Sequence, residues 1–421
     1  MTLARLLPDA AERFPDRAAL AFEGERVSYA ELDRLAEAAT PEARVLPLPL
    51  PNTPESVARF HGALRHGAVV VPLNPLLSER EIEQRRRPFE PAPGTAVVLY
   101  TSGTTGEPKR VELSHELLRR NAEYLARNAL ALTEEDVLFG SAPLAHVFGM
   151  TACMNASIAA GATLALVHRF EPRAALEAIE RERVTVFMGV PAMLAGLLAA
   201  SADTGRTPRL RLAHCGGAPL PLETLRAFEE RFGCTVLEGY GMTEAGGAVA
   251  TNHTGRPRKP GSVGQAAAGN ELRIAADGEV LAHVEGRRLA TGDVGRLDDD
   301  GYLFLLDRKK DVILRGGYTV YPREVEEALV AHPAVREAVV VGVPHPTLGE
   351  EVAALVVAEG CASHELKAFV RERVAAYKYP RVVAIVDDLP RGPSGKILRR
   401  SIDRDALASL LPGNDDPLGA R

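Results

Sequence analysis

The run AVVLYTSGTTGEPK at residues 96–109 joins an apolar stretch of strand length to a small polar loop. Glycine lets a backbone approach a ligand closely, hydroxyls and backbone N–H groups donate hydrogen bonds, and lysine neutralises charge. The run therefore predicts a strand followed by a polyphosphate-binding loop, the alternative being an ordinary surface loop. The GK[ST] ending of a Walker A loop is absent. The candidate phosphate-binding residues are Thr101, Ser102, Gly103, Thr104, Thr105, Gly106 and Lys109.

Length and composition predict a multidomain globular protein. The chain has 421 residues, more than one hydrophobic core usually holds. Its net charge of −6 gives no reason to expect nucleic acid as a partner. The four cysteines are far apart and form no CxxC pair, so neither a zinc site nor a disulfide framework is indicated. With no signal peptide and no long apolar span in the sequence, we expect a soluble, cytoplasmic protein.

Strand-like and helical patterns alternate along the first two thirds of the chain, which predicts parallel sheets covered by helices. The predicted strands include residues 96–100, 163–167, 185–188, 210–214 and 235–237. Residues 271–307 contain turn signals at Asp277-Gly278 and Asp300-Gly301, typical of a small antiparallel unit.

The last hundred residues predict a separate α+β domain. A helix is expected from Pro322 to before Pro333, another is expected to be capped by Ser363, and strands are expected at 338–343 and 382–386. We therefore predict domains at 1–307 and 308–411, followed by a disordered tail at 412–421.

The loop at 101–109 resembles the phosphate loop of the acyl-adenylate-forming (AMP-binding) superfamily, which includes acyl-CoA synthetases, peptide-synthetase adenylation domains and luciferases. Further motifs follow in register through nearly the whole chain. The resemblance implies an α/β fold: a large N-terminal domain of helix-covered β-sheets with a small antiparallel β unit, then a mobile α+β C-terminal domain. One departure is Arg110, where the family usually has glycine. Arg110 is expected either to reduce loop mobility or to add charge near the phosphates.

Four motifs of the N-terminal domain carry implied roles. PLAHVFGM at 143–150 and GVPAML at 189–194 resemble segments that line the acyl pocket, with His146 near the reacting carboxylate. GGAPLP at 216–221 and EGYGMTE at 238–244 resemble adenine and acyl-adenylate segments. Tyr240 would stack on adenine, Thr243 would bind the α-phosphate and Glu244 would hold Mg²⁺. The other implied nucleotide-binding residues are Gly217, Ala218, Pro219, Gly239, Gly241 and Met242. Taken singly, such residues are more often a loop histidine, a core aromatic or a surface acid.

Three later motifs complete the series. TGD at 291–293 resembles the ribose-binding motif, with Asp293 accepting from the ribose hydroxyls. In DRKKDV at 307–312, Arg308 would also reach the ribose and Lys310 occupies the hinge position between the domains. In LPRGPSGKILRR at 389–400, Lys396 would bridge the acyl carboxylate and the α-phosphate. Without the series, these basic residues would be read as parts of a solvated linker and loop.

The resemblance implies ATP, Mg²⁺ and coenzyme A as cofactors of an acid–thiol ligase. Amino-acid-activating domains carry an aspartate in the segment after the phosphate loop, and PLAHVFGM has no acid. We therefore expect a non-amino carboxylic acid as substrate and a monomer or homodimer. Transfer to a carrier protein or an amine, and an inactive nucleotide-binding relative, remain alternatives. The chain is short for the family, with an expected gap between Glu83 and Thr95.

Overall fold

The computed structural model describes residues 2–102, 108–391 and 397–411, so the expected tail at 412–421 lies outside it. The chain divides into two compact units. Unit 1 comprises Met1–Arg273, Leu281–Leu289 and Leu297–Phe304. Unit 2 comprises Ile274–Val280, Ala290–Arg296 and Leu305–Arg421. The domain ranges 1–307 and 308–411 stay predictions.

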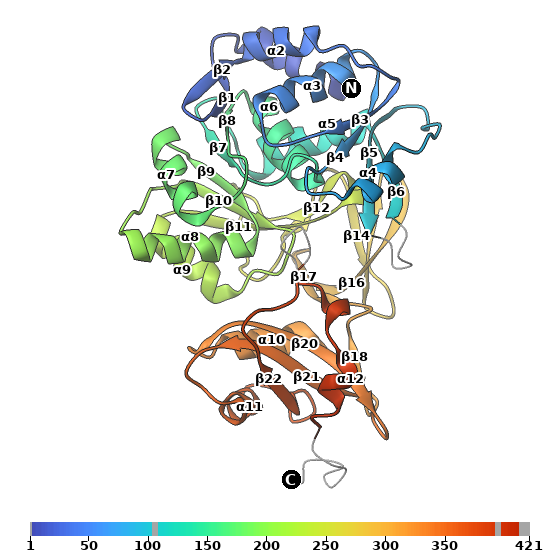
Figure 1. The fold of residues 1–421 in the computed structure, drawn as a ribbon, viewed down its shortest axis with the longest axis vertical. Helices are drawn as coiled ribbons and strands as arrows, with labels where there is room; N and C mark the ends of the chain where they lie inside the picture. The colour runs from blue at the N-terminus through green and yellow to red at the C-terminus, as the bar shows by residue number, and fades with distance from the viewer. Residues whose placement is uncertain (1, 103–107, 392–396, 412–421) are drawn as a thin grey trace. The chain divides into compact units, whose positions relative to one another are not determined.

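A nine-stranded sheet forms the centre of unit 1 (Figure 1). Its six inner strands pair in parallel, as expected for strands that alternate with helices, and the outer pairs are antiparallel. In sheet order the strands are β13 (Gln265–Ala266), β12 (Gly247–Thr251), β11 (Thr235–Met242), β10 (Leu212–Gly216), β9 (Val186–Gly189), β7 (Val137–Gly140), β8 (Thr163–Leu166), β1 (Ala18–Phe22) and β2 (Glu25–Ser28). The predicted strand at 210–214 therefore begins two residues later than expected.

A second sheet of unit 1 has four strands. They are β3 (Val45–Pro49), β4 (Val69–Leu73), β5 (Thr95–Ser102) and β6 (Pro108–Ser114). β5 and β6 pair antiparallel, with Thr101 opposite Lys109. The motif at 101–109 therefore connects two paired strands, and its residues 103–107 lie outside the described part of the chain.

Helices cover both faces of the nine-stranded sheet. On one face lie α7, α8 and α9 (Figure 1). Their apolar residues form one core with side chains of β9, β10 and β11. In α9 the buried residues Leu225, Phe228 and Phe232 recur at helical spacing. The helices of unit 1 are α1 (Leu6–Arg13), α2 (Tyr29–Ala38), α3 (Pro54–Arg65), α4 (Glu79–Arg86), α5 (His115–Tyr124), α6 (Ala156–Ala160), α7 (Pro172–Glu182), α8 (Pro191–Thr204) and α9 (Leu222–Phe232), with short segments η1 (Leu3–Arg5), η2 (Leu125–Ala129), η3 (Phe148–Asn155) and η4 (Thr243–Ala245).

Two further sheets follow. One is formed by β14 (Glu271–Ile274), β15 (Glu279–Val284), β16 (Arg287–Leu297) and β17 (Leu303–Arg308). The short turns between consecutive paired strands make it antiparallel, and Gly278 and Gly301 adopt φ of +82° and +78° at the predicted turns. The other has β18 (Ile313–Arg315), β19 (Tyr318–Val320), β20 (Val335–His345), β21 (Gly349–Ala358) and β22 (Val382–Ile385), with α10 (Pro322–Val330), α11 (Ser363–Arg371), η5 (Arg399–Ser401) and α12 (Arg404–Ala408).

One predicted helix cap is wrong. Ala362, not Ser363, precedes the first turn of α11. The carboxylate of Glu365 accepts a hydrogen bond from the Ala362 N–H at 2.8 Å, which is one half of a capping box; the other half, from a side chain at the cap to the first turn, is not possible for alanine.

Asp136 joins the amino ends of three neighbouring strands. Asp136, Thr185 and Arg211 directly precede β7, β9 and β10. The Arg211 guanidinium donates to both Asp136 oxygens at 2.6 Å, and the Thr185 hydroxyl donates at 2.7 Å. Burial alone would raise the pKa of this carboxyl, but hydrogen bonds from Arg211, Thr133 and Thr185 outweigh it and hold the pKa below its usual value.

None of the described helices combines the length and the apolar character that crossing a bilayer requires.

Histidine 61 makes the stability of unit 1 depend on pH. Its ring is buried in α3, and neither ring nitrogen has a hydrogen-bond partner among the described residues. Burial lowers its pKa to about 3, so the unfolded chain takes up a proton near pH 6.5 that the folded chain refuses. Stability is therefore lost as pH falls below 6.5. The free energy of unfolding of the wild type should fall between pH 6.5 and pH 5. In His61→Met we expect this fall to be smaller by about 2 kcal/mol.

Urea unfolding followed by circular dichroism measures this decline, because the chain has no tryptophan. The exposed His66 is the matched position, and His66→Gln should keep the wild-type pH dependence. An unchanged pH dependence in His61→Met would contradict the prediction.

Glycine 241 is required by the close approach of β11 and β12. A Cβ at this position would lie 2.3 Å from the carbonyl oxygen of Gly247, a backbone atom that cannot rotate away. We expect Gly241→Ala to lower the free energy of unfolding by about 1–3 kcal/mol. Gly255→Ala is the control, since a Cβ there meets nothing within 4 Å. Thermal unfolding of both variants gives the comparison, and equal stability would show that β12 shifts at no cost.

Candidate active site

The parallel pairing of β10 and β11 brings two predicted motifs together. Gly216 pairs with Gly239, so the GGAPLP and EGYGMTE segments leave the same edge of the sheet side by side. A Cβ on Gly216 would lie 3.1 Å from the Gly239 carbonyl oxygen. The next residue, Gly217, has a φ of +81°, which an L side chain rarely adopts. The predicted nucleotide-binding residues Gly217, Ala218 and Pro219 are exposed at this edge.

The EGYGMTE segment runs along β11 into the short helix η4. Its first carboxylate, that of Glu238, is buried and accepts a hydrogen bond from the Gly261 N–H at 2.7 Å. Tyr240 and Met242 are half-buried against the core, and Gly241 is exposed. Thr243 and Glu244 are half-buried in η4. The structure thus groups these predicted residues at the carboxyl end of β11.

The PLAHVFGM segment ends in the π-helix η3, and the geometry there requires Gly149, whose Cβ would lie 2.2 Å from the Pro143 carbonyl oxygen. His146 is exposed, and its backbone N–H donates to Pro143 at 2.9 Å. The Phe148 ring lies nearly parallel to that of His214, with centroids 6.1 Å apart. GVPAML spans the end of β9 and the start of α8, where Pro191 is the first helical residue.

Histidine 214 was not predicted from the sequence as a residue near the site. It is buried in β10, and burial lowers its pKa to about 4, so the ring is neutral. Its Nε2 lies 3.3 Å from the Thr251 hydroxyl, and a Cβ on Gly239 would approach Nε2 to 2.6 Å. A histidine in an apolar strand directly before the GGAP turn was the available signal.

Lysine 109 and Arg110 follow the predicted phosphate loop on β6. Lys109 is exposed opposite Thr101. The Arg110 guanidinium lies over the Phe89 ring at 4.4 Å, and its Nε is 3.3 Å from Glu112. The charge of Arg110 is therefore engaged by its own sheet and by the connection before β5.

The predicted ribose-binding residues lie together in unit 2. The Arg308 Nε is 2.9 Å from the Asp293 carboxylate, which is buried while Arg308 is 60% exposed. Strand β16 carries Asp293, and Arg308 ends β17. The following Lys309 pairs with Asp277 and Glu279, two contacts that sequence reasoning missed. The predicted hinge residue Lys310 is exposed. Lys396 lies outside the described residues.

Glu244 suits a shared magnesium site rather than a protein cage. Among the residues that the structure describes, no group of three or more His, Cys, Asp or Glu could hold a metal ion. Mg²⁺ is commonly bound by one or two carboxylates together with substrate phosphates and waters. A single half-buried carboxylate beside a predicted nucleotide-binding segment fits that pattern.

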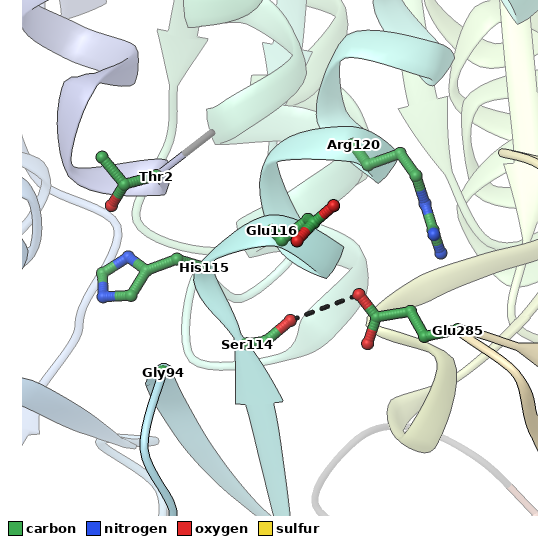
Figure 2. A pocket seen from close by; sticks show the side chains of 7 residues that line it. All are labelled: Thr2, Gly94, Ser114, His115, Glu116, Arg120 and Glu285. Carbon is green, nitrogen blue, oxygen red and sulfur yellow. Dashed lines mark hydrogen bonds between the residues drawn. The ribbon is translucent and has the colours of Figure 1, made fainter.

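A polar recess at the start of α5 is separate from these segments. It is lined by Thr2, Gly94, Ser114, His115, Glu116, Arg120 and Glu285 (Figure 2). The Ser114 hydroxyl donates to Glu285 at 3.4 Å, while His115 and Arg120 point away from each other (Figure 2). Its charged groups do not converge on one ligand, so we assign it no role.

Comparisons with known proteins identify the family of the chain. The family described as AMP-binding enzyme matches residues 7–92 and 84–296, and the AMP-binding enzyme C-terminal domain matches 324–396. The chain is 31% identical to a long-chain-fatty-acid–CoA ligase of Bacillus subtilis, over 95% of this chain and 94% of the relative. It is 33% identical to a 2-succinylbenzoate–CoA ligase of Bacillus velezensis, over 93% and 96%.

Solved structures agree with the fold. The o-succinylbenzoate–CoA synthetase of Bacillus subtilis, in complex with its acyl-adenylate intermediate, has a TM-score of 0.81 and 30% identity over 95% of this chain and 98% of that one. The anthranilate–CoA ligase AuaEII has a TM-score of 0.87 over 97% and 98%, at 24% identity. The expected α/β fold is confirmed. With both of its family domains matched and full-length relatives above 30% identity, the chain belongs to the AMP-binding enzyme family, among its acyl-CoA ligases.

Proposed function

We propose that the protein joins a non-amino carboxylic acid to coenzyme A at the expense of ATP. The adjacency of the GGAPLP and EGYGMTE segments, set by the pairing of Gly216 with Gly239, carries this proposal. Relatives named for 2-succinylbenzoate, long-chain fatty acids and ferulate support it, because each name describes a non-amino acid joined to CoA.

Two displacements make up the reaction. First, a carboxylate oxygen attacks the α-phosphorus of ATP, the bond to the β-phosphate oxygen breaks, and pyrophosphate leaves. The acid is already ionised near neutral pH, so this step needs no general base. Second, the CoA thiol loses its proton and attacks the acyl carbonyl, and AMP leaves from the acyl-adenylate. Catalysis of the first step therefore consists mainly of positioning two anions and neutralising their charge.

The residues divide this work. Lys396 neutralises the reacting carboxylate and the α-phosphate, and Thr243 donates a hydrogen bond to that phosphate. Lys109 and the hydroxyls of the loop at 101–106 bind the outgoing phosphates. Glu244 would hold Mg²⁺, which when bound supplies charge neutralisation at the phosphates.

Other residues bind the rest of the nucleotide and the acid. Tyr240 stacks on adenine, with Gly217, Ala218, Pro219, Gly239, Gly241 and Met242 around it. Asp293 accepts hydrogen bonds from the ribose hydroxyls and Arg308 supports it, as their 2.9 Å contact allows. His146 borders the acid. Lys310 serves as the hinge between domains 1–307 and 308–411.

The setting of the protein is part of the proposal. We place it in the cytoplasm as a monomer or homodimer. All four cysteines are unpaired, which suits a reducing compartment. Light scattering of the purified chain tests the oligomeric state.

The first half-reaction is tested by ATP–pyrophosphate exchange with a panel of acids: benzoate, ferulate, 2-succinylbenzoate, octanoate and palmitate. We expect exchange with at least one acid, and Lys396→Ala to lower the rate by at least about 100-fold because its charge neutralisation is lost. Lys367→Ala is the control, since Lys367 in α11 donates to the Arg381 carbonyl and belongs to none of the predicted site segments. Absence of exchange with a wide panel, with nucleotide still bound, would instead indicate an inactive relative.

The acceptor is tested with the best acid of the panel. We expect an acyl-CoA thioester that forms only when CoA is present, measured by mass spectrometry. Carrier protein and a primary amine serve as competing acceptors. Faster transfer to either of them than to CoA would overturn the assignment of the acceptor and leave that of the first half-reaction standing.

A further inference from the structure

Arginine 399 makes a two-pronged contact with Glu326 inside unit 2. Its Nη2 lies 2.6 Å from Glu326 Oε1 and 2.8 Å from Oε2. Glu326 projects from α10, and its Oε1 also accepts a hydrogen bond from the Val340 N–H of β20 at 2.7 Å. One carboxylate therefore ties η5, α10 and β20 together.

The other arm of the Arg399 guanidinium faces two more acids. Its Nη1 lies 3.9 Å from Asp307 and 4.0 Å from Asp311, too far for a direct hydrogen bond, and has no hydrogen-bond partner among the described residues. Asp307 is fixed in turn, since it accepts from the N–H groups of Arg308 at 2.7 Å and Arg323 at 2.8 Å.

A single cation thus stands among three carboxylates. The Asp307 side chain is 4% exposed, and burial raises its pKa, with Asp311 adding to the effect. Burial likewise raises the pKa of Glu326 to about 7, although Arg399 acts in the opposite direction. Without Arg399 the acids would repel one another, so this arginine holds residues 307–311 and α10 in their places.

Arg399 also follows the predicted catalytic segment directly. Arg391 and Ile397, which flank residues 392–396, form an antiparallel bridge, and the Leu398 N–H donates to Pro390 at 2.7 Å. Arg391 pairs with Glu337 of β20. Both described ends of this segment are therefore fixed to the same sheet.

We propose that Arg399, held by Glu326, is a positioning residue for acyl-adenylate formation: it fixes residues 397–401 against residues 307–311 and so sets where the chain leaves the segment that carries Lys396. The proposal rests on the proposed function, in which Lys396 serves the first half-reaction only. Lysine is a poor replacement for this arginine, because the guanidinium holds Glu326 through Nη2 and places a second nitrogen, Nη1, toward Asp307 and Asp311, whereas an ammonium group has one nitrogen only.

Comparing the two half-reactions distinguishes a loss of positioning for adenylate formation from a general loss of folding, because only a general loss would lower both rates. In Arg399→Lys we expect kcat for ATP–pyrophosphate exchange to fall about 10- to 100-fold with little change in the KM for ATP. Thioester formation from synthetic acyl-adenylate and CoA should stay within twofold of wild type. Arg373→Lys is the matched control, since Arg373 lies over Phe369 in the same unit and outside this cluster. An exchange rate within twofold of wild type, or an equal loss in both half-reactions, would overturn the proposal.

The pH dependence gives a second readout. Glu326 faces Arg399 of η5 and lies near Asp307, while Asp311 faces the other arm of Arg399; the pairing of Glu326 with Arg399 is lost as pH falls through about 7. The exchange rate of the wild type should therefore decline below that pH. Glu326→Gln keeps an acceptor for Val340 but not the charge, so its exchange rate should be low throughout and lack this decline. An identical pH profile in both proteins would count against the proposal.

Hydrogen–deuterium exchange tests the contact without any acid substrate. Arg399→Lys and Glu326→Gln should raise amide exchange in peptides covering 307–315 and 397–402, and Arg373→Lys should not. If the wild type activates no acid but these peptides respond, the proposed function fails, while the structural role of the Arg399–Glu326 contact is supported. If the peptides do not respond, the Arg399–Glu326 contact does not fix these residues, and the proposal is refuted whatever activity the enzyme has.

Discussion

The parallel contact between Gly216 and Gly239 is the constraint on which the candidate site depends. The two residues are 23 positions apart in sequence, and only the register of β10 and β11 places them opposite each other. Space at this contact is so limited that a Cβ on either residue would press on a carbonyl oxygen or on the ring of His214. These glycines are therefore required by the packing of the strands as well as by any ligand. Strand packing and ligand binding both require glycine at these two positions, so a substitution would affect both.

The opposite ends of the same strands have a different task. At the amino ends of β7, β9 and β10, the Asp136 carboxylate accepts four hydrogen bonds, from the Thr133 N–H, the Thr185 hydroxyl and two nitrogens of Arg211. At the carboxyl ends, the chain turns through exposed residues such as Gly217 and Pro219. Ligands of open α/β sheets bind at the carboxyl ends of the strands. A fixed amino end allows the carboxyl end to carry irregular backbone without loss of register.

Sequence reasoning succeeded where a local signal has one structural solution. Alternating strands and helices predicted the parallel sheet, and Asp-Gly turns predicted the small antiparallel one. It failed where the deciding contact is distant. The π-helix at residues 148–155 was not predicted, although its Gly149 has no room for a Cβ beside the Pro143 carbonyl oxygen. The Arg399–Glu326 pair joins residues 73 positions apart, and His214 gains its meaning only from Phe148 and Thr251. Motifs predict the residues of a site, but the residues that support the site depend on tertiary packing, which a local pattern does not show.

Arg110 contacts the short connection between α4 and β5. The alignment with the Bacillus subtilis fatty-acid–CoA ligase extends over 532 positions, more than the 421 residues available here. The two stretches matched by the AMP-binding family meet at residues 84–92, inside the gap expected from the sequence.

There the chain passes from α4 to β5 through a short connection, and β6 closes it. Arg110 covers the Phe89 ring, and Glu112, two residues further on the same face, accepts from the Ala92 N–H at 2.8 Å. A glycine at position 110 would leave Phe89 uncovered and Glu112 without its cation. The side chain of Arg110 therefore serves the sheet and the connection before β5.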